Sequence, residues 1–278
     1  MTEVKILHYD MAPGVVAFST MRQGGCSTGN YGSLNINRYC GDDETHIARN
    51  REALCQLLGI SDDRLVMPHQ THDTRVACID ERFLSLAMAE RQAALEGIDA
   101  LMTNQQGVCI GVSTADCIPL LLYDPHHHAA CAVHAGWRGT VARIAQKAVK
   151  AMSETYGTQP TELTAQIGPG ISLDSFEVGQ EVYDAFAAAG FDMSVISKRY
   201  PAHTCQHLPS PFGDEPGARL KWHINLTECN RQQLLTGGLC ADRIHLCGIC
   251  TYKAYDTYFS ARRLGIHSGR IFTGILYR

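Results

Sequence analysis

Cys117 and His134 are the two residues whose types and spacing most directly suggest chemistry. They lie 17 residues apart. Cys117 immediately precedes the apolar run 118–123, and His134 ends a second apolar run that begins at residue 129. The sequence between the runs, Asp124-Pro125-His126-His127, is typical of a turn. The segment is therefore predicted to be a β-hairpin with a thiol and an imidazole at its open end.

An antiparallel hairpin brings these two side chains together. With the turn centred between Pro125 and His126, Cys117 lies directly across from His134. Opposed Cβ atoms on one face of a sheet are about 5 Å apart, which lets a thiolate and an imidazole share one metal ion. A lone buried cysteine or histidine usually only packs, but this pair lies where strand ends open to solvent. We therefore interpret the pair as a site.

A catalytic zinc ion needs a third protein ligand, because it typically has three such ligands and one open position. The segment 68–73 offers two candidates, His69 and His72. Either histidine could serve, and spacing alone does not choose between them.

The elements that must position these residues form a mixed pattern. The order of strands and helices is irregular, which favours an α+β fold, a single domain of mixed β-sheets flanked by helices, over a strict βαβ repeat. Strands are predicted at 14–19, 75–79, 108–112, 118–123, 129–134, 163–167, 243–246 and 270–277. Helices are predicted at 44–58, 141–156, 179–189 and 226–236. Residues 203–218, rich in proline and glycine, are expected to be a long loop within that domain.

Composition limits the partners. With 45% apolar and 19% charged residues, the chain has the composition of an ordinary globular protein. A net charge of −4 gives no reason to expect nucleic-acid binding, which basic patches drive. The N-terminal residues lack a signal-peptide pattern, and no apolar run is long enough to span a membrane. We therefore expect a cytoplasmic protein whose twelve cysteines are reduced.

Three further motifs carry weaker signals. The glycine-rich stretch 22–32 could hold an anion with backbone N–H groups, but an ordinary turn is as good an interpretation. Cys247 and Cys250 form a C-x-x-C without the second pair that a zinc ribbon needs, which favours structural cysteines. The triplet 126–128 of histidines is interpreted as a solvated turn.

Three segments together carry a resemblance to a known family. His69-Gln70-Thr71-His72, Thr114-Ala115-Asp116-Cys117 and His134-Ala135-Gly136-Trp137-Arg138-Gly139-Thr140 resemble the hallmark segments of the bacterial laccase-domain family. That family is also described as polyphenol oxidoreductases, purine nucleoside phosphorylases and peptidoglycan-editing factors. Shorter matches continue at 33–35, 41–43, 50–51, 167–169, 176–179 and 258–263. The resemblance covers residues 18 to about 270 and argues for one catalytic domain over 1–278.

The resemblance implies a zinc ion held by His72, Cys117 and His134, and so it selects the second of the two candidate histidines. Two departures affect loops and no ligand. Asp73 stands where relatives usually carry glycine, and 172–175 replaces a common Gly-Pro-Cys type of turn.

The implied activity is phosphorolysis of adenosine, inosine, guanosine or methylthioadenosine, together with deamination of adenosine. Zinc with an open position can activate water for the deamination. Phosphorolysis also needs a cationic pocket for phosphate near the ribose. The expected substrate-binding groups are the guanidinium groups of Arg22 and Arg138, the backbone N–H groups of Gly136 and Gly139, and the amide of Asn35. Asp116 is grouped with the three ligands as a catalytic candidate that orients the nucleoside or the zinc ligands, although it could equally be a turn residue.

Three alternatives compete with this interpretation. Cys117 could be a nucleophile activated by His134 in a thiol hydrolase that acts on peptidoglycan precursors. A copper polyphenol oxidase would need several histidine-rich copper sites, so zinc is favoured over copper. A purely structural zinc site is disfavoured because no fourth cysteine ligand lies nearby in the sequence.

Overall fold

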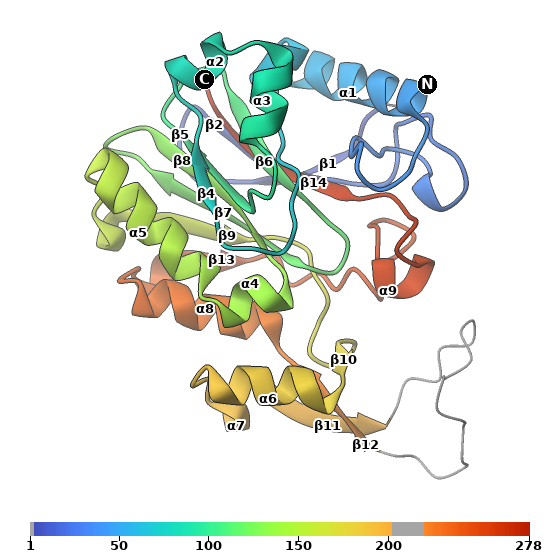
Figure 1. Ribbon diagram of the computed structural model, residues 1–278, viewed down its shortest axis with the longest axis vertical. Coiled ribbons are helices and arrows are strands. Elements are labelled where there is room, and N and C mark those ends of the chain that lie inside the picture. Colours follow the sequence, from blue (N-terminus) through green and yellow to red (C-terminus); the bar gives the residue numbers. More distant parts are fainter. Residues whose placement is uncertain (1–2, 202–219) are drawn as a thin grey trace.

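Two mixed β-sheets packed face to face form the centre of the molecule (Figure 1). The computed structural model describes residues 3–201 and 220–278. Within that part of the chain, the five-stranded sheet has the order β1 (Ile6–Tyr9), β2 (Val15–Thr20), β14 (Ile271–Tyr277), β6 (Cys109–Thr114) and β3 (Leu65–Val66). The six-stranded sheet has the order β13 (Ile244–Leu246), β9 (Thr164–Ile167), β7 (Ile118–Asp124), β8 (Ala129–Ala135), β5 (Ala100–Thr103) and β4 (Val76–Cys78). Each sheet contains both parallel and antiparallel pairs, so the predicted α+β class is confirmed.

Alternation of side chains along the strands builds a four-layered core. On β7, Leu121 and Tyr123 face the five-stranded sheet, where they pack with Ile110 and Ile275. The intervening residue, Leu122, packs on the other face against α5 (Ile144–Tyr156) and α8 (Leu226–Thr236). The outer face of the five-stranded sheet is covered in the same way by α1 (Glu44–Leu58).

A third, antiparallel sheet lies beside these layers, at the bottom of Figure 1. Its order is β10 (Glu177–Val178), β12 (Leu220–Ile224) and β11 (Ser197–Pro201), and α6 (Gln180–Ala188) and α7 (Met193–Ile196) accompany it. Phe186 and Ile224 belong to the same apolar cluster as Leu122 of β7. The small sheet therefore shares the main core.

The shorter helices lie around the two large sheets. They are α2 (Glu81–Ser85), α3 (Met88–Ala94), α4 (Trp137–Val141) and α9 (Ala261–Leu264). No helix in residues 3–201 and 220–278 combines the length and the apolar character that crossing a membrane requires.

Most sequence-predicted elements are confirmed to within two residues. Helix α1 has the predicted bounds because Asp43 accepts hydrogen bonds from two backbone N–H groups at its start and Gly59 ends it with a left-handed φ of 67°. The predicted helix 141–156 was wrong at its start. Arg143 has φ = 65° and separates α4 from α5, so the longer helix begins at Ile144. The predicted loop 203–218 lies outside the described residues.

The predicted register of the hairpin was also wrong. In the β7–β8 ladder His134 pairs with Pro119, and the last paired residues at the turn are Asp124 and Ala129. The turn is therefore centred one residue later than predicted, and His134 is two positions away from the residue that was expected to face it. Because a shift of two residues preserves the face, Cys117 and His134 still share one side of the sheet as diagonal neighbours.

Candidate metal centre

His72, Cys117 and His134 meet at one end of the interface between the two large sheets. Their ligand atoms, two imidazole nitrogens and a thiol sulfur, all lie within 4.8 Å of one another. His72 comes from the loop between β3 and β4, Cys117 immediately precedes β7, and His134 lies on β8. Among the described residues, no other group of three histidine, cysteine or acidic side chains is arranged to hold a metal ion.

His69, the other candidate histidine, is occupied elsewhere. Its Nδ1 lies 2.8 Å from a carboxylate oxygen of Glu96, and its ring stacks on Tyr39 with centroids 4.1 Å apart. The geometry therefore selects His72, the residue that the family resemblance implied.

Asp99 fixes the orientation of His134. The Asp99 carboxylate lies 2.7 Å from His134 Nδ1, and the two residues are 0% and 3% exposed. When Nδ1–H donates to this carboxylate, Nε2 is left with its lone pair free for a metal ion. The backbone N–H of His134 also donates to the carbonyl oxygen of Asp99, at 2.8 Å, across the β5–β8 ladder.

The same carboxylate organises the loop that carries His72. It accepts hydrogen bonds from the backbone N–H groups of Thr71, His72 and Asp73, at 3.1, 3.0 and 2.9 Å. His72 itself has φ = 64°, an uncommon conformation for a residue with a side chain, and these bonds hold it there. Sequence reasoning missed Asp99. Its only signal was an acidic residue directly before the short apolar run 100–102, which was not recognised as a strand.

Asp116 holds the backbone beside Cys117. Its carboxylate accepts hydrogen bonds from Thr251 Oγ1 and the backbone N–H of Arg262, both at 2.7 Å. Asp116 is 8% exposed and has φ = 87°, so these contacts fix a strained turn at the start of β7.

Gly136 leaves the space that the cluster occupies. A Cβ at this position would lie 2.6 Å from His72 Cδ2 and 3.2 Å from Cys117 Sγ. Gly139 lies nearby in α4, where a Cβ would come within 3.2 Å of the carbonyl oxygen of Asp73. The glycines of this segment therefore let α4 pack closely against the His72 loop.

The electrostatics of the cluster favour an ionised sulfur. Burial opposes ionisation of Cys117, but the charge of His134 and hydrogen bonds from His134 and His72 outweigh it and lower the Cys117 pKa to about 6. Burial likewise opposes protonation of His134, but the Cys117 thiolate and Asp99 raise the His134 pKa to about 9. Cys117 Sγ lies 3.8 Å from His72 Nε2. The interactions within this pair therefore favour the charged form of both side chains.

The expected phosphate-binding arginines differ in their surroundings. Arg138 is exposed, and its guanidinium stacks on Trp137 at 4.3 Å and forms no hydrogen bond or ion pair with the described residues. Arg22 donates hydrogen bonds to the carbonyl oxygens of Gly32 and Tyr255, and burial lowers its pKa. Arg138 is therefore free to meet a ligand, whereas Arg22 ties two loops together.

Asn35 is fully buried and bonded on both sides of its amide. Its Nδ2 donates to Asp42 at 2.8 Å, and its Oδ1 accepts from the backbone N–H groups of Asn37 and Arg270. The hydrogen-bond partners of this amide are Asn37, Cys40, Asp42 and Arg270, and none of them is a candidate metal ligand.

The donor set fits one zinc ion. Two imidazoles and a thiolate are typical zinc ligands, and three protein ligands leave one coordination position for a substrate or water. Several copper ions would need more ligand groups than the described residues bring together.

Comparison with known proteins identifies a family for this chain. The model of the multi-copper polyphenol oxidoreductase laccase family matches residues 16–278, and the chain belongs to that family. The family resemblance drawn from the sequence is thereby confirmed.

Individual relatives cover nearly the whole chain. A protein of Bacteroides thetaiotaomicron named purine nucleoside phosphorylase is 46% identical over 259 residues, which are 93% of this chain and 90% of the relative. A protein from an unknown prokaryotic organism, named adenosine deaminase RL5, is 44% identical over 94% of each chain. The crystal structure of a Bacillus licheniformis hypothetical protein, YfiH, has a TM-score of 0.84 and 26% identity and covers 98% of this chain and 96% of that one.

Proposed function

We propose that this protein is a zinc-dependent purine nucleoside phosphorylase that also deaminates adenosine. The proposal rests on the converging His72, Cys117 and His134 side chains, in a chain 46% and 44% identical to relatives named for these two activities. The proposed substrates are adenosine, inosine, guanosine and methylthioadenosine, with phosphate as the second substrate.

In this proposal His72, Cys117 and His134 hold the zinc ion. When bound, zinc supplies a Lewis acid that polarises substrate oxygen atoms and lowers the pKa of water to about 7. Asp99 keeps the His134 Nδ1 proton in place and anchors the His72 loop by three backbone bonds. Asp116 holds the turn from which the Cys117 sulfur projects.

Phosphate would be bound by cationic and N–H groups that follow His134 in the sequence. Arg138 is exposed and carries a guanidinium free for bidentate contact with an oxyanion. The backbone N–H groups of Gly136 and Gly139 are proposed as further donors. Arg22 and Asn35 complete the proposed substrate-binding set. Their side chains form hydrogen bonds within the protein, which supports an indirect role in which they position the surrounding loops.

The proposed setting is a single catalytic domain over residues 1–278, in the cytoplasm, where thiols stay reduced. The proposed partners are small molecules. We expect no nucleic-acid binding at physiological salt, since the net charge is −4.

A second candidate is a thiol hydrolase that acts on peptidoglycan precursors. The observation that favours it is the low pKa of Cys117 beside His134, because a thiolate is the nucleophilic form of cysteine. The copper polyphenol oxidase of the family's description is a weaker candidate, since the described residues offer only one ligand cluster.

The deciding experiment combines metal analysis with a nucleoside screen in the presence and absence of phosphate. We expect roughly one zinc ion per chain and release of purine base that requires phosphate. Arg138→Gln should raise the KM for phosphate, whereas Arg138→Lys should keep part of the affinity. Base release without phosphate would indicate a hydrolase, and copper as the main bound metal would restore the oxidase.

A further inference from the structure

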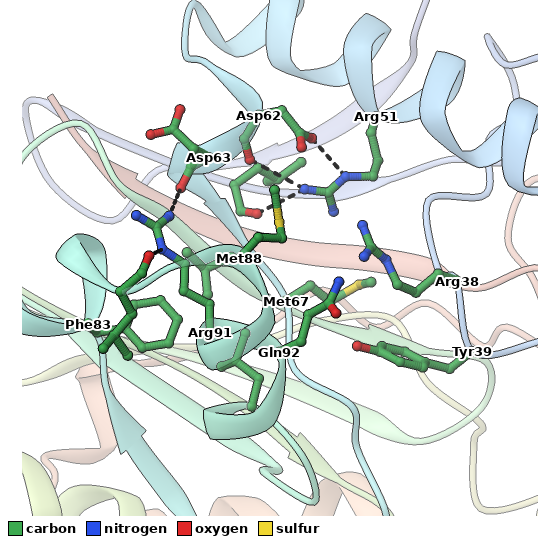
Figure 2. A pocket seen from close by; sticks show the side chains of 14 residues that line it. Arg38, Tyr39, Arg51, Asp62, Asp63, Met67, Phe83, Met88, Arg91 and Gln92 are labelled. Atoms are coloured by element: carbon green, nitrogen blue, oxygen red, sulfur yellow. Dashed lines mark hydrogen bonds and ion pairs between the residues drawn. The ribbon is translucent and has the colours of Figure 1, made fainter.

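A cavity adjoins β3 and the residue that follows it, Met67. It has a volume of about 250 Å³ and is formed by α1, α2, α3, β3 and the loops between them (Figure 2). It is lined by Arg38, Tyr39, Arg51, Asp62, Asp63, Leu65, Val66, Met67, Phe83, Leu86, Met88, Arg91, Gln92 and Leu95. None of the three candidate metal ligands lines it.

The inner wall of this cavity is apolar. Leu65, Val66 and Met67 of the β3 segment and Phe83 of α2 are each at most 7% exposed and belong to the cores on either side of the five-stranded sheet. Such a wall favours an apolar or aromatic body over a sugar.

One arginine that lines the cavity has a guanidinium group free to bind a ligand. Arg38 is exposed, and its guanidinium forms no hydrogen bond or ion pair with residues 3–201 and 220–278. Figure 2 shows this guanidinium and the Gln92 amide pointing toward the middle of the cavity. Both groups can donate hydrogen bonds to one oxyanion.

The other charged groups restrict the charge of a ligand. Arg51 is paired with the Asp62 carboxylate at 2.8 Å, and Arg91 donates to backbone carbonyl oxygens, including that of Asp63. The carboxylates of Asp62 and Asp63 also line the cavity. Because three guanidinium groups and two carboxylates line the cavity, the net charge of its lining is +1, which suits a single negative charge better than the two charges of a phosphate monoester.

We propose that this cavity is a binding site for a small organic monoanion, a carboxylate attached to an apolar and preferably aromatic body. The carboxylate is held by Arg38 and Gln92, and the body packs on Phe83 and the β3 residues. The volume lies just below the range of about 300–1,000 Å³ for sites that bind drug-sized ligands, so it fits a smaller molecule.

This site is chemically independent of the metal centre. Tyr39, at its edge, stacks on His69, and His69 pairs with Glu96, so His69 is engaged in a different contact from those of His72. The inference therefore does not depend on the proposed nucleoside chemistry.

The test is a ¹⁹F NMR titration of the purified protein with 4-fluorophenylacetate. Saturable binding is expected, and Arg38→Gln should weaken it about tenfold or more, as loss of a charged hydrogen bond implies. Gln92→Glu, on an exposed helix position, should weaken it by charge repulsion. Arg38→Lys should retain part of the affinity. The neutral alcohol 2-(4-fluorophenyl)ethanol should bind at least about tenfold more weakly than the carboxylate.

Two controls separate this site from others. Arg49→Gln removes an exposed arginine of α1 that does not line the cavity and should leave binding unchanged. Cys117→Ala removes a candidate metal ligand and should also leave probe binding unchanged. If the probe's carboxylate instead bound to metal at that centre, this variant would lose the binding. The proposal is overturned by an absence of saturable binding, by full affinity in folded Arg38→Gln and Gln92→Glu variants, or by loss of binding in Cys117→Ala.

Discussion

At the scale of single residues, one buried carboxylate links two of the three candidate ligands. Asp99 bonds the ring of His134 and the backbone of the His72 loop at the same time. Burial opposes ionisation of Asp99, but hydrogen bonding and charge from His134, with the backbone bonds, lower its pKa. A single residue therefore fixes both the tautomer of one ligand and the position of another.

Replacing Asp99 with asparagine should weaken zinc binding about 10–100-fold, the usual cost of losing a partner that orients a ligand. The asparagine amide would still accept backbone N–H bonds but would lack the charge that stabilises His134 Nδ1–H. Competition for zinc with a fluorescent chelator measures the affinity. Asp124→Asn is the matched control, since Asp124 is a buried carboxylate at the far end of β7, and it should lose stability without losing zinc affinity. Equal zinc affinity in wild type and Asp99→Asn would refute the role.

Cys117 variants separate a metal ligand from a nucleophile. Cys117→Ala should lose zinc and nucleoside activity together and still fold, because the residue lies at a strand end outside the main core clusters. Cys117→Asp should keep partial zinc binding and some activity, since carboxylate oxygen is also a zinc ligand. Elemental analysis, activity and circular dichroism of each variant provide the measurement. Full zinc occupancy in Cys117→Ala would falsify the ligand role.

At the scale of elements, the sequence contained the hairpin but not its register. Two apolar runs around a turn predict β7 and β8 within one residue, because each run is continuously apolar and is bounded by polar, turn-forming residues. The sequence placed the centre of the turn one residue too early, and the contacts within the turn explain its actual position. Asp124 accepts hydrogen bonds from the backbone N–H groups of His126 and His127 and pairs with the His127 ring. These contacts fix a turn of four residues, Pro125 to His128.

The residues that contact His69, His72 and His134 from distant positions in the sequence could not be predicted from local sequence patterns. Strand β5 has four residues and was missed, and with it Asp99, which acts on residues 27 and 35 positions away. The choice between His69 and His72 depended on Glu96 and Tyr39, and neither contact follows from local pattern. By contrast, Cys117 and His134 were found because one local hairpin brings them together.

The turn contacts predict a pH-dependent contribution to stability. Burial opposes ionisation of Asp124, but its hydrogen bonds outweigh burial and lower its pKa. Because the folded pKa lies below the unfolded value, the stabilisation is complete above roughly pH 5 and is lost as pH falls through about 4 toward the folded pKa. Urea unfolding should show wild type about 1–3 kcal/mol more stable than Asp124→Asn at pH 7, with a smaller difference at about pH 3. A difference that is constant with pH would contradict this assignment.

At the scale of the whole molecule, one continuous core joins the small sheet to β7 and β8, the strands next to Cys117 and His134. The apolar cluster beneath the six-stranded sheet includes residues of β7, β8, α5, α6 and β12. The metal-ligand loops lie at the opposite end of the sheet–sheet interface from the β7–β8 turn. Since no separate core supports the small sheet among the described residues, we expect it to unfold together with the rest of the chain.

The two tryptophans of the chain allow a direct test of this unity. Trp137 lies in α4 beside the candidate centre, and Trp222 lies in β12 of the small sheet, where it stacks on Tyr183 at 4.1 Å. Trp222→Phe leaves a fluorescence reporter only near the metal centre, and Trp137→Phe leaves one only in the small sheet. In urea, the fluorescence midpoint of each variant should coincide with that variant's own far-ultraviolet circular dichroism midpoint. Added zinc should shift both reporters by the same free energy, because a ligand of the native state stabilises the whole cooperative unit. A Trp222 signal that changes at lower urea and ignores zinc would show that the small sheet is a separate unit.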